Sequence, residues 1–281
     1  MPDSRSQSVA WSDDALGNPH AVADKAARVR SMFSAIAPSY DLNNRLHSLW
    51  QDQAWRRAAV RQAAPKATDV VLDVACGTGD LAMAFRKAGA QQVLGVDFTY
   101  DMLAIARQKV AGRRVGVIPG KPPRGSMPGL DPVLNPKSEI RNPRFLRYAA
   151  GDALRLPLPD ACVDIVSIAF GIRNVADPAR AVAEFRRVLR PGGRLVILEF
   201  SLPGNSVLRG LYRFYFERVM PRTASWIAGD RSGAYRYLPR SVNTFIDRTT
   251  MTAMMQKAGF AGVTLRPLTL GIAVIYRGVR P

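Results

Sequence analysis

The segment Asp73-Val-Ala-Cys-Gly77-Thr-Gly79-Asp80 constrains the fold of this chain more than any other stretch. It follows a short apolar run over residues 70–74 and precedes a helical pattern over residues 81–88. Gly77 and Gly79 let the backbone turn sharply and approach a ligand closely, and the helix that follows directs its free N–H groups at that ligand. The order strand, glycine turn, helix therefore indicates a ligand-binding βα unit, although a tight turn without a ligand is the alternative.

Short apolar runs alternate with helical patterns along most of the chain. The runs expected to be strands cover residues 70–74, 93–96, 145–149, 163–169 and, after an Arg-Pro-Gly-Gly turn, 194–200. The expected helices cover residues 21–33, 42–64, 81–88, 102–110, 178–189, 208–220 and 241–258. Residues 263–267 and 272–276 are expected to form a terminal antiparallel hairpin. This alternation predicts an α/β fold, with a parallel sheet and helices on both faces.

The pattern also predicts how the chain is organised. Residues 1–20 are polar and are expected to form a flexible N-terminal tail. Residues 21–281 are expected to form one domain, in which residues 21–65 make a helical cap. Residues 112–143 contain seven prolines and five glycines, and we expect them to be an irregular insertion without a core of its own.

Composition excludes several classes of protein. Two cysteines and two histidines cannot build a disulfide framework or a clustered zinc site, and no metal is expected. No apolar run approaches the roughly 20 residues that a spanning helix needs, and no signal peptide is visible, so a cytoplasmic protein is expected. The net charge of +18, with 33 arginines among 40 basic residues, favours nucleic acid, anionic lipid or an acidic partner. Genome composition explains such arginine usage equally well.

A carboxylate follows the second expected strand, 20 residues after Gly77. Asp97 is placed to accept both hydrogen bonds from a ribose diol, which fits a nicotinamide dinucleotide and S-adenosylmethionine alike. Asp73 favours S-adenosylmethionine, because an acid at the end of the first strand suits the ammonium of an amino-acid end and repels a pyrophosphate. Asp152, after the third strand, can accept from an adenine amino group, or it is a cap or turn residue. The terminal hairpin is also typical of methyltransferases.

Six segments between residues 26 and 278 carry a more particular pattern. They are residues 32–44 (MFSAIAPSYDLNN), 71–81 (VLDVACGTGDL), 169–175 (AFGIRNV), 187–201 (RVLRPGGRLVILEFS), 235–238 (YRYL) and 254–260 (MMQKAGF). On these segments the chain resembles the quinone-biosynthesis C-methyltransferases. The resemblance implies a class I S-adenosylmethionine-dependent methyltransferase fold, with a Rossmann-like, mostly parallel seven-stranded sheet and a C-terminal antiparallel hairpin. It also implies C-methylation of a polyprenyl quinol, either demethylmenaquinol or a polyprenyl-methoxy-benzoquinol.

Individual residues now have candidate roles. The resemblance implies that Thr78, Asp97, Asp152 and Ala153 contact the cofactor, and the glycine turn and strand end described above add Asp73, Gly77 and Gly79. The candidate substrate residues are Arg173 and Asn174, with Tyr40, Tyr235 and Tyr237 in the ring pocket. Arg173 is expected to stabilise the phenolate that develops during methyl transfer, and it is not the general base because a guanidinium stays protonated. The alternative for Arg173 is a salt bridge to a neighbouring helix, and the alternative for the three tyrosines is plain packing. Two departures from the family are Ala169, where serine is usual, and the insertion at 112–143.

Partners follow from the expected substrate. A polyprenyl tail resides in a bilayer, so we expect transient contact with an anionic membrane surface, at its inner face. The arginines Arg209, Arg213 and Arg218, beside Tyr212, Phe214, Tyr215 and Phe216, are the expected contact, and an ordinary packed helix is the alternative. A homodimer or a quinone-biosynthesis complex is a further expectation. The rival functions are a methyltransferase for another small or lipid-like acceptor, a basic nucleic-acid-binding protein and, last, a nicotinamide dehydrogenase; no nucleic acid is expected.

Overall fold

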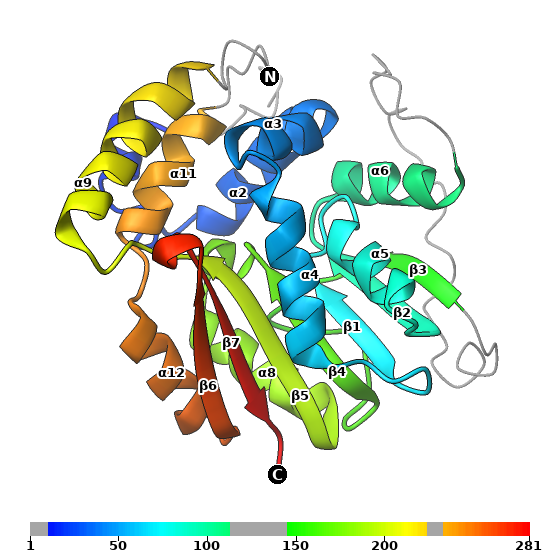
Figure 1. The fold of residues 1–281 in the computed structure, drawn as a ribbon. Coiled ribbons are helices and arrows are strands. Elements are labelled where there is room, and N and C mark those ends of the chain that lie inside the picture. Colours follow the sequence, from blue (N-terminus) through cyan, green and yellow to red (C-terminus); the bar gives the residue numbers. More distant parts are fainter. Residues whose placement is uncertain (1–10, 113–144, 224–232) are drawn as a thin grey trace, which may run out of the picture.

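A seven-stranded sheet lies at the centre of the computed structural model, which describes residues 11–112, 145–223 and 233–281 (Figure 1). Its strands are β1 (Val70–Val74), β2 (Gln92–Asp97), β3 (Phe145–Ala150), β4 (Val163–Ala169), β5 (Leu189–Phe200), β6 (Ala261–Leu268) and β7 (Ala273–Val279). Their order is β3-β2-β1-β4-β5-β7-β6. The first five strands pair in parallel, and β7 runs antiparallel to both β5 and β6. The predicted parallel sheet and terminal hairpin are confirmed.

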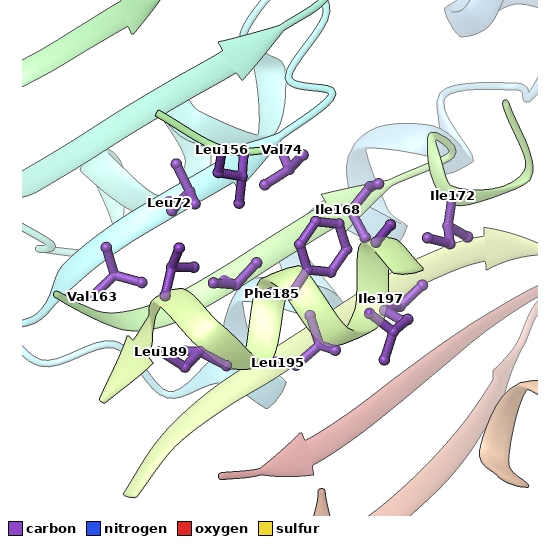
Figure 2. Packing of buried hydrophobic residues seen from close by; sticks show 14 of the residues in the cluster. Leu72, Val74, Leu156, Val163, Ile168, Ile172, Phe185, Leu189, Leu195 and Ile197 are labelled. Carbon is purple, nitrogen blue, oxygen red and sulfur yellow. The ribbon is translucent and has the colours of Figure 1, made fainter. Parts of the chain in front are cut away.

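Helices cover both faces of the sheet. The helices α8 (Pro178–Val188) and α12 (Arg248–Lys257) cover one face, and α4 (Gln51–Ala63), α5 (Asp80–Lys87) and α6 (Tyr100–Val110) cover the other. Side chains of β1 alternate between the two cores, because successive residues of a strand point to opposite faces: Leu72 packs on the first face and Val71 on the second. Figure 2 shows the first core, where the ring of Phe185 from α8 is directed toward Ile168 of β4.

A layer of further helices lies across the end of the sheet where the parallel strands finish (Figure 1). It contains α1 (Asp13–Gly17), α2 (Lys25–Ile36), α3 (Tyr40–His47), α9 (Ser206–Phe214) and α11 (Ala234–Asn243). Short helical turns join some of these parts: 3₁₀ turns η1 (Ala37–Ser39), η2 (Ile172–Asn174) and η4 (Thr269–Gly271), and the π-helical η3 (Tyr215–Val219). The expected cap over residues 21–65 therefore supplies only part of this layer.

The prediction of a loose tail is wrong for residues 11–20. Trp11 and Leu16 are each only 4% exposed, because they pack against α2 and α11. The Trp11 ring lies 4.4 Å from the ring of Tyr237, centroid to centroid. Ser12 caps α1 by accepting a hydrogen bond from the Ala15 N–H. Residues 1–10 and 113–144 lie outside the described residues, and with them almost all of the expected insertion at 112–143.

Three local predictions also need correction. The helix expected over 42–64 is two helices, because Leu49 and Trp50 take left-handed backbone angles, with φ of 49° and 59°. The helix expected over 241–258 is also two, since Asp247 caps a new helix by accepting from the Thr250 N–H. The expected turn over residues 190–193 is part of β5, where the register with β4 shifts as in a β-bulge.

The helix expected over 208–220 is confirmed as α9 and η3, but its aromatic residues do not share one surface. Phe216 is 7% exposed and stacks on Tyr212 inside the helical layer. The large apolar side chains that point outward include Leu211 and Phe214 of α9, which are 64% and 62% exposed. The predicted group of four outward aromatic residues is therefore wrong for Tyr212 and Phe216.

Asp73 is a deeply buried carboxyl group of the sheet, and it has no charged partner within hydrogen-bonding distance among the described residues. Asp73 of β1 pairs across the sheet with Ser167 of β4, and its Oδ1 accepts a hydrogen bond of 2.9 Å from the Ser167 hydroxyl. Its Oδ2 has no partner among the described residues, and the side chain is 1% exposed. Burial raises the pKa of Asp73 to about 7, although the Ser167 hydroxyl opposes the shift.

This pKa predicts a stability that depends on pH. Unfolded aspartate titrates near pH 4, so between pH 4 and 7 the folded chain holds a proton that the unfolded chain has released. The contribution of Asp73 to the free energy of unfolding should therefore fall as pH rises, by up to about 1.4 kcal/mol per pH unit. Asp73→Asn should be more stable relative to wild type at pH 7.5 than at pH 5 in urea denaturation without ligand. Ser167→Ala should lower the free energy of unfolding more at pH 7.5 than at pH 5, because the Ser167 hydroxyl then donates to a charged carboxylate. Equal differences at both pH values would contradict the assignment.

Candidate functional site

Two cavities lie between the carboxyl end of the sheet and the helical layer. The first cavity is lined by the ends of β1 and β2, the segment after β3, residues 169–176 and α2. The second cavity is lined by α2, α3, α4, η2 and α11. They enclose about 860 and 620 Å³ of free space, the parts open to solvent included, which is the usual size range of small-molecule sites. Phe33, Tyr40 and Phe170 line both, so the cavities adjoin at these three rings.

Asp97 holds the glycine turn in place at the first cavity. Its Oδ2 accepts a hydrogen bond of 2.8 Å from the Gly77 N–H, and its Oδ1 accepts one of 2.7 Å from the Thr99 N–H. Burial raises the pKa of Asp97, and these hydrogen bonds oppose the rise. The Thr99 side chain also hydrogen-bonds to this carboxylate, whose two oxygens together offer about four lone-pair sites. Asp97 therefore combines a structural role with free acceptor capacity in the cavity wall.

The two residues after Gly77 do not line the first cavity. Gly79 has a φ of 84°, and a Cβ at this position would lie 2.3 Å from the Tyr148 hydroxyl oxygen. A glycine is required there for packing as well as for conformation. The Thr78 hydroxyl donates a hydrogen bond of 2.6 Å to Asp41 of α3. Both residues thus shape the turn behind the cavity wall.

Asp152 and Ala153 do line the first cavity, as the sequence suggested. Asp152 Oδ1 accepts a hydrogen bond of 2.9 Å from the Leu154 N–H, so the turn role that was its alternative is present as well. Asp73 is not in the wall, but its unpartnered Oδ2 is a buried acceptor at the end of β1. The apolar wall includes Phe98 and Met102, which the sequence did not single out. Phe98 directly follows Asp97, and this was the available signal for it.

The second cavity brings together four predicted residues from distant parts of the chain. Tyr40, Arg173, Tyr235 and Tyr237 all line it. Burial raises the pKa of Tyr40 and of Tyr237, so both hydroxyls stay protonated at neutral pH. Sequence reasoning missed the contribution of α4, which adds Asp52, Trp55 and Arg56 to the wall. No signal pointed to these three, because a helical pattern does not say which face meets a cavity.

Arg173 is buried in the wall of the second cavity, where it is 4% exposed. Its Nη1 donates hydrogen bonds of 2.7 Å to Glu199 Oε1 and 2.6 Å to the Phe170 carbonyl oxygen. Arg173 therefore forms a salt bridge, but its partner lies on strand β5 and not on a neighbouring helix, as the alternative had it. The Nε–H has no partner among the described residues, although the atom is buried. The guanidinium is thus fixed by Glu199 and still has a donor to offer.

Asn174 connects the two cavities. It lines the first cavity, and its Oδ1 accepts a hydrogen bond of 2.9 Å from the hydroxyl of Tyr237, which lines the second. Its Nδ2 donates to the Phe170 carbonyl oxygen at 3.2 Å, the same oxygen that Arg173 binds. Neither cavity has metal-ligand chemistry, since the described residues contain no group of three histidine, cysteine or acidic side chains that could hold an ion.

Comparison with known proteins identifies the family. The model of the ubiE/COQ5 methyltransferase family matches residues 21–118 and 137–280. The chain is 45% identical over 251 residues to a demethylmenaquinone methyltransferase of Thermus thermophilus, covering 89% of this chain and 100% of the relative. It is 37% identical over 263 residues to the ubiquinone/menaquinone biosynthesis C-methyltransferase UbiE of a Geobacter species, covering 93% of this chain and 100% of that one.

Solved structures agree on the fold. A SAM-dependent methyltransferase of Thermotoga maritima, described as a possible histamine N-methyltransferase, superposes with a TM-score of 0.57 and 19% identity, covering 90% of this chain and 100% of that one. An identity of 19% supports a shared fold and nothing more. The family model and the relatives above match most of the sequence, so they establish the family. The expected S-adenosylmethionine-dependent methyltransferase is confirmed: the chain belongs to the ubiE/COQ5 methyltransferase family.

Proposed function

We propose that this enzyme transfers the methyl group of S-adenosylmethionine to a ring carbon of a polyprenyl quinol in quinone biosynthesis. The observation that carries the proposal is the pair of adjoining cavities, of which the second has a wall of aromatic rings and a buried arginine. The names of the two relatives given above point to the same chemistry. The ring would be a demethylmenaquinol or a polyprenyl-methoxy-benzoquinol.

The first cavity suits the methyl donor. Asp97 would accept the ribose hydroxyls with its free lone pairs, and Asp152 Oδ2 would accept from the adenine amino group. Asp73, at the end of β1, offers a buried oxygen without a partner to the amino-acid end of the donor. Gly77 and Ala153 complete the wall, while Thr78 and Gly79 act by shaping the turn. The donor supplies an activated methyl group, and the residues of the first cavity would position it.

The second cavity suits the acceptor ring. Tyr40, Tyr235 and Tyr237 would pack on the ring, and the adjoining rings of Phe33 and Phe170 mark where its reactive carbon would meet the methyl group. A ring carbon becomes nucleophilic as a neighbouring hydroxyl loses its proton. The Arg173 Nε–H, buried and without a partner in the described structure, would stabilise the oxyanion that develops. Another small or lipid-like acceptor would use the same wall.

A membrane surface is the partner that the tail of such a substrate requires. Among the described residues, no helix is long and apolar enough to cross a bilayer. Exposed apolar side chains instead gather on α9, where Val207 is 69% exposed, and at the break between α3 and α4, where Trp50 is 58% exposed. The hydroxyl of Tyr215, just after α9, lies 3.4 Å from His47 at the end of α3. The helix α9 and the break between α3 and α4 together form the surface that would meet the bilayer.

The proposed reaction is testable with purified enzyme. Under anaerobic conditions, wild type should convert a short-chain demethylmenaquinol or methoxy-benzoquinol to its C-methylated product in the presence of S-adenosylmethionine, and mass spectrometry of the ring would locate the new methyl group. Cells that lack this chain should accumulate the demethylated quinone. Failure to methylate either quinol, together with turnover of an unrelated acceptor, would refute the proposed substrate.

The cofactor placement predicts the effect of one substitution. Asp97→Ala should weaken S-adenosylmethionine binding by about 1.5–3 kcal/mol, the range for hydrogen bonds to a charged group. Part of the loss will come from the Gly77 and Thr99 N–H groups, which lose their acceptor. Calorimetry measures the affinity, and Asp152→Ala is the matched comparison, expected to lose less because Asp152 is exposed. Unchanged affinity in Asp97→Ala would remove Asp97 from the ribose site.

The membrane proposal predicts binding to anionic vesicles that weakens as salt rises. Replacing Arg209, Arg213 and Arg218 by glutamine should weaken it further, by less than about 1 kcal/mol for each arginine near the surface. Arg209 already donates to the carbonyl oxygens of Pro203 and Gly204, and Arg213 lies 3.6 Å from Glu217, so neither is fully available. A Leu211→Ser variant tests the contribution of the exposed apolar side chains of α9, and it should also weaken vesicle binding. Co-sedimentation measures binding; a wild type that ignores anionic vesicles at low salt would refute the idea.

A further inference from the structure

The proposed reaction needs a proton acceptor, and one side chain in the second cavity is suited to that role. The ring hydroxyl must lose its proton before or during attack by the neighbouring carbon. Arg56 and Arg173 stay protonated in proteins, and burial keeps Tyr40 and Tyr237 in their neutral form. Among the described residues that line the second cavity, Asp52 is the only carboxylate, and there is no histidine, cysteine or lysine.

Asp52 is held rigidly in the wall. It lies in the first turn of α4 and is 4% exposed. Its Oδ2 accepts hydrogen bonds of 2.8 Å from Arg56 Nη1 and 3.0 Å from Gln53 Nε2. Its Oδ1 accepts a single bond of 3.1 Å, from the hydroxyl of Ser48. A carboxylate oxygen has two lone pairs, so Oδ1 keeps one for a further donor.

The ion pair of Asp52 and Arg56 lies near Phe170, and this contact locates the pair relative to the two cavities. The Arg56 guanidinium carbon lies 5.5 Å from the centre of the Phe170 ring, and Phe170 is one of the three residues that line both cavities. The Asp52–Arg56 pair is therefore beside the junction of the cavities, where methyl transfer would occur. Arg173, the proposed oxyanion donor, lines the same cavity from η2.

The charges around Asp52 are balanced. Arg56 faces it from the same helix, and Arg173 shares the cavity. Behind Asp52, the Gln53 amide also donates to Asp80 of α5, at 2.9 Å. Asp80 is itself paired with Lys109 at 2.7 Å and Arg45 at 3.6 Å. No uncompensated negative charge faces Asp52 among the described residues, and its own carboxylate is matched by Arg56.

We infer that Asp52 is the general base of the reaction, an assignment that rests on the quinol methylation proposed above. The proton of the ring hydroxyl moves to Asp52 Oδ1, and the oxygen electrons flow into the ring. The neighbouring ring carbon forms a bond to the methyl carbon as the methyl–sulfur bond breaks, with its electron pair left on sulfur. The methylated carbon then loses its hydrogen as a proton to water, and Asp52 returns its proton to the ring oxygen. One proton is released in total.

The decisive variant is Asp52→Asn, which keeps the shape and removes the base. With a water-soluble quinol that wild type methylates, its kcat at pH 7 should fall about 100-fold or more, the usual contribution of a general base. Affinity for S-adenosylmethionine and KM for the quinol should change less than about threefold. The defect should shrink at least tenfold between pH 7 and 9.5, because a phenolic hydroxyl, with a pKa near 10, then loses its proton without help.

Two further variants keep the test decisive. Asp52→Glu retains a carboxylate and its charge, and it should keep at least ten times the kcat of Asp52→Asn. Asp164→Asn is the matched control, since Asp164 is also an ion-paired carboxylate but lies at the start of β4, away from both cavities; its kcat should equal that of wild type.

The outcomes separate the two proposals. If wild type methylates no quinol, the proposed function fails. If wild type does so and Asp52→Asn retains its kcat, or shows a defect that is constant with pH, the assignment of Asp52 is overturned and the proposed function stands. Equal losses in Asp52→Asn and Asp52→Glu would likewise overturn it, because they would show a role in packing alone.

Discussion

The hydrogen bond from the Gly77 N–H to Asp97 is the contact on which the whole site depends. It joins the turn after β1 to the end of β2, and leaving this N–H without an acceptor would cost about 1–3 kcal/mol. The turn also needs space: Tyr148 of β3 packs where a Cβ of Gly79 or Gly95 would lie, at 2.3 and 2.5 Å from its nearest atoms. Residues of β1, β2 and β3 thus fix the backbone of this one turn. The Asp97 carboxylate, which binds the turn, also lines the first cavity.

Polar contacts connect this turn to the helical layer. Asp41 of α3 accepts from the Thr78 hydroxyl and pairs with Lys109 of α6 at 2.5 Å. Lys25 of α2 is 2% exposed and donates to the carbonyl oxygens of Arg173 and Val175, at 2.8 and 2.6 Å. The helical layer is therefore joined to both loops that line the site by charge-assisted hydrogen bonds, which are stronger than hydrogen bonds between neutral groups.

The sheet was predictable because its signals are local. A short apolar run such as residues 163–169, with four β-branched residues and helical patterns along the chain on both sides, indicates a buried strand. The 20-residue spacing of Gly77 and Asp97 places both at one edge of a parallel sheet. The second cavity was not predictable in this way, because its wall combines α2, α3, α4, η2 and α11. The resemblance supplied Tyr40 and Tyr237, but Asp52 became visible only once α4 was placed. Trp11 was missed because a single apolar residue in a polar segment has no periodic pattern.

Phe170 shows how the junction of the cavities is maintained. It has a φ of 56°, a left-handed conformation that costs a residue with a side chain about 1–2 kcal/mol. Its N–H donates to the Leu198 carbonyl oxygen at 2.7 Å, and its own carbonyl oxygen accepts from both Arg173 and Asn174. This strained backbone turns the ring between the cavities while the carbonyl group fixes one polar side chain from each wall. A strained residue that persists with all its hydrogen bonds made is typical of a functional site. At Phe170, the strain accompanies a ring that lines both cavities, where the proposed donor and acceptor would meet.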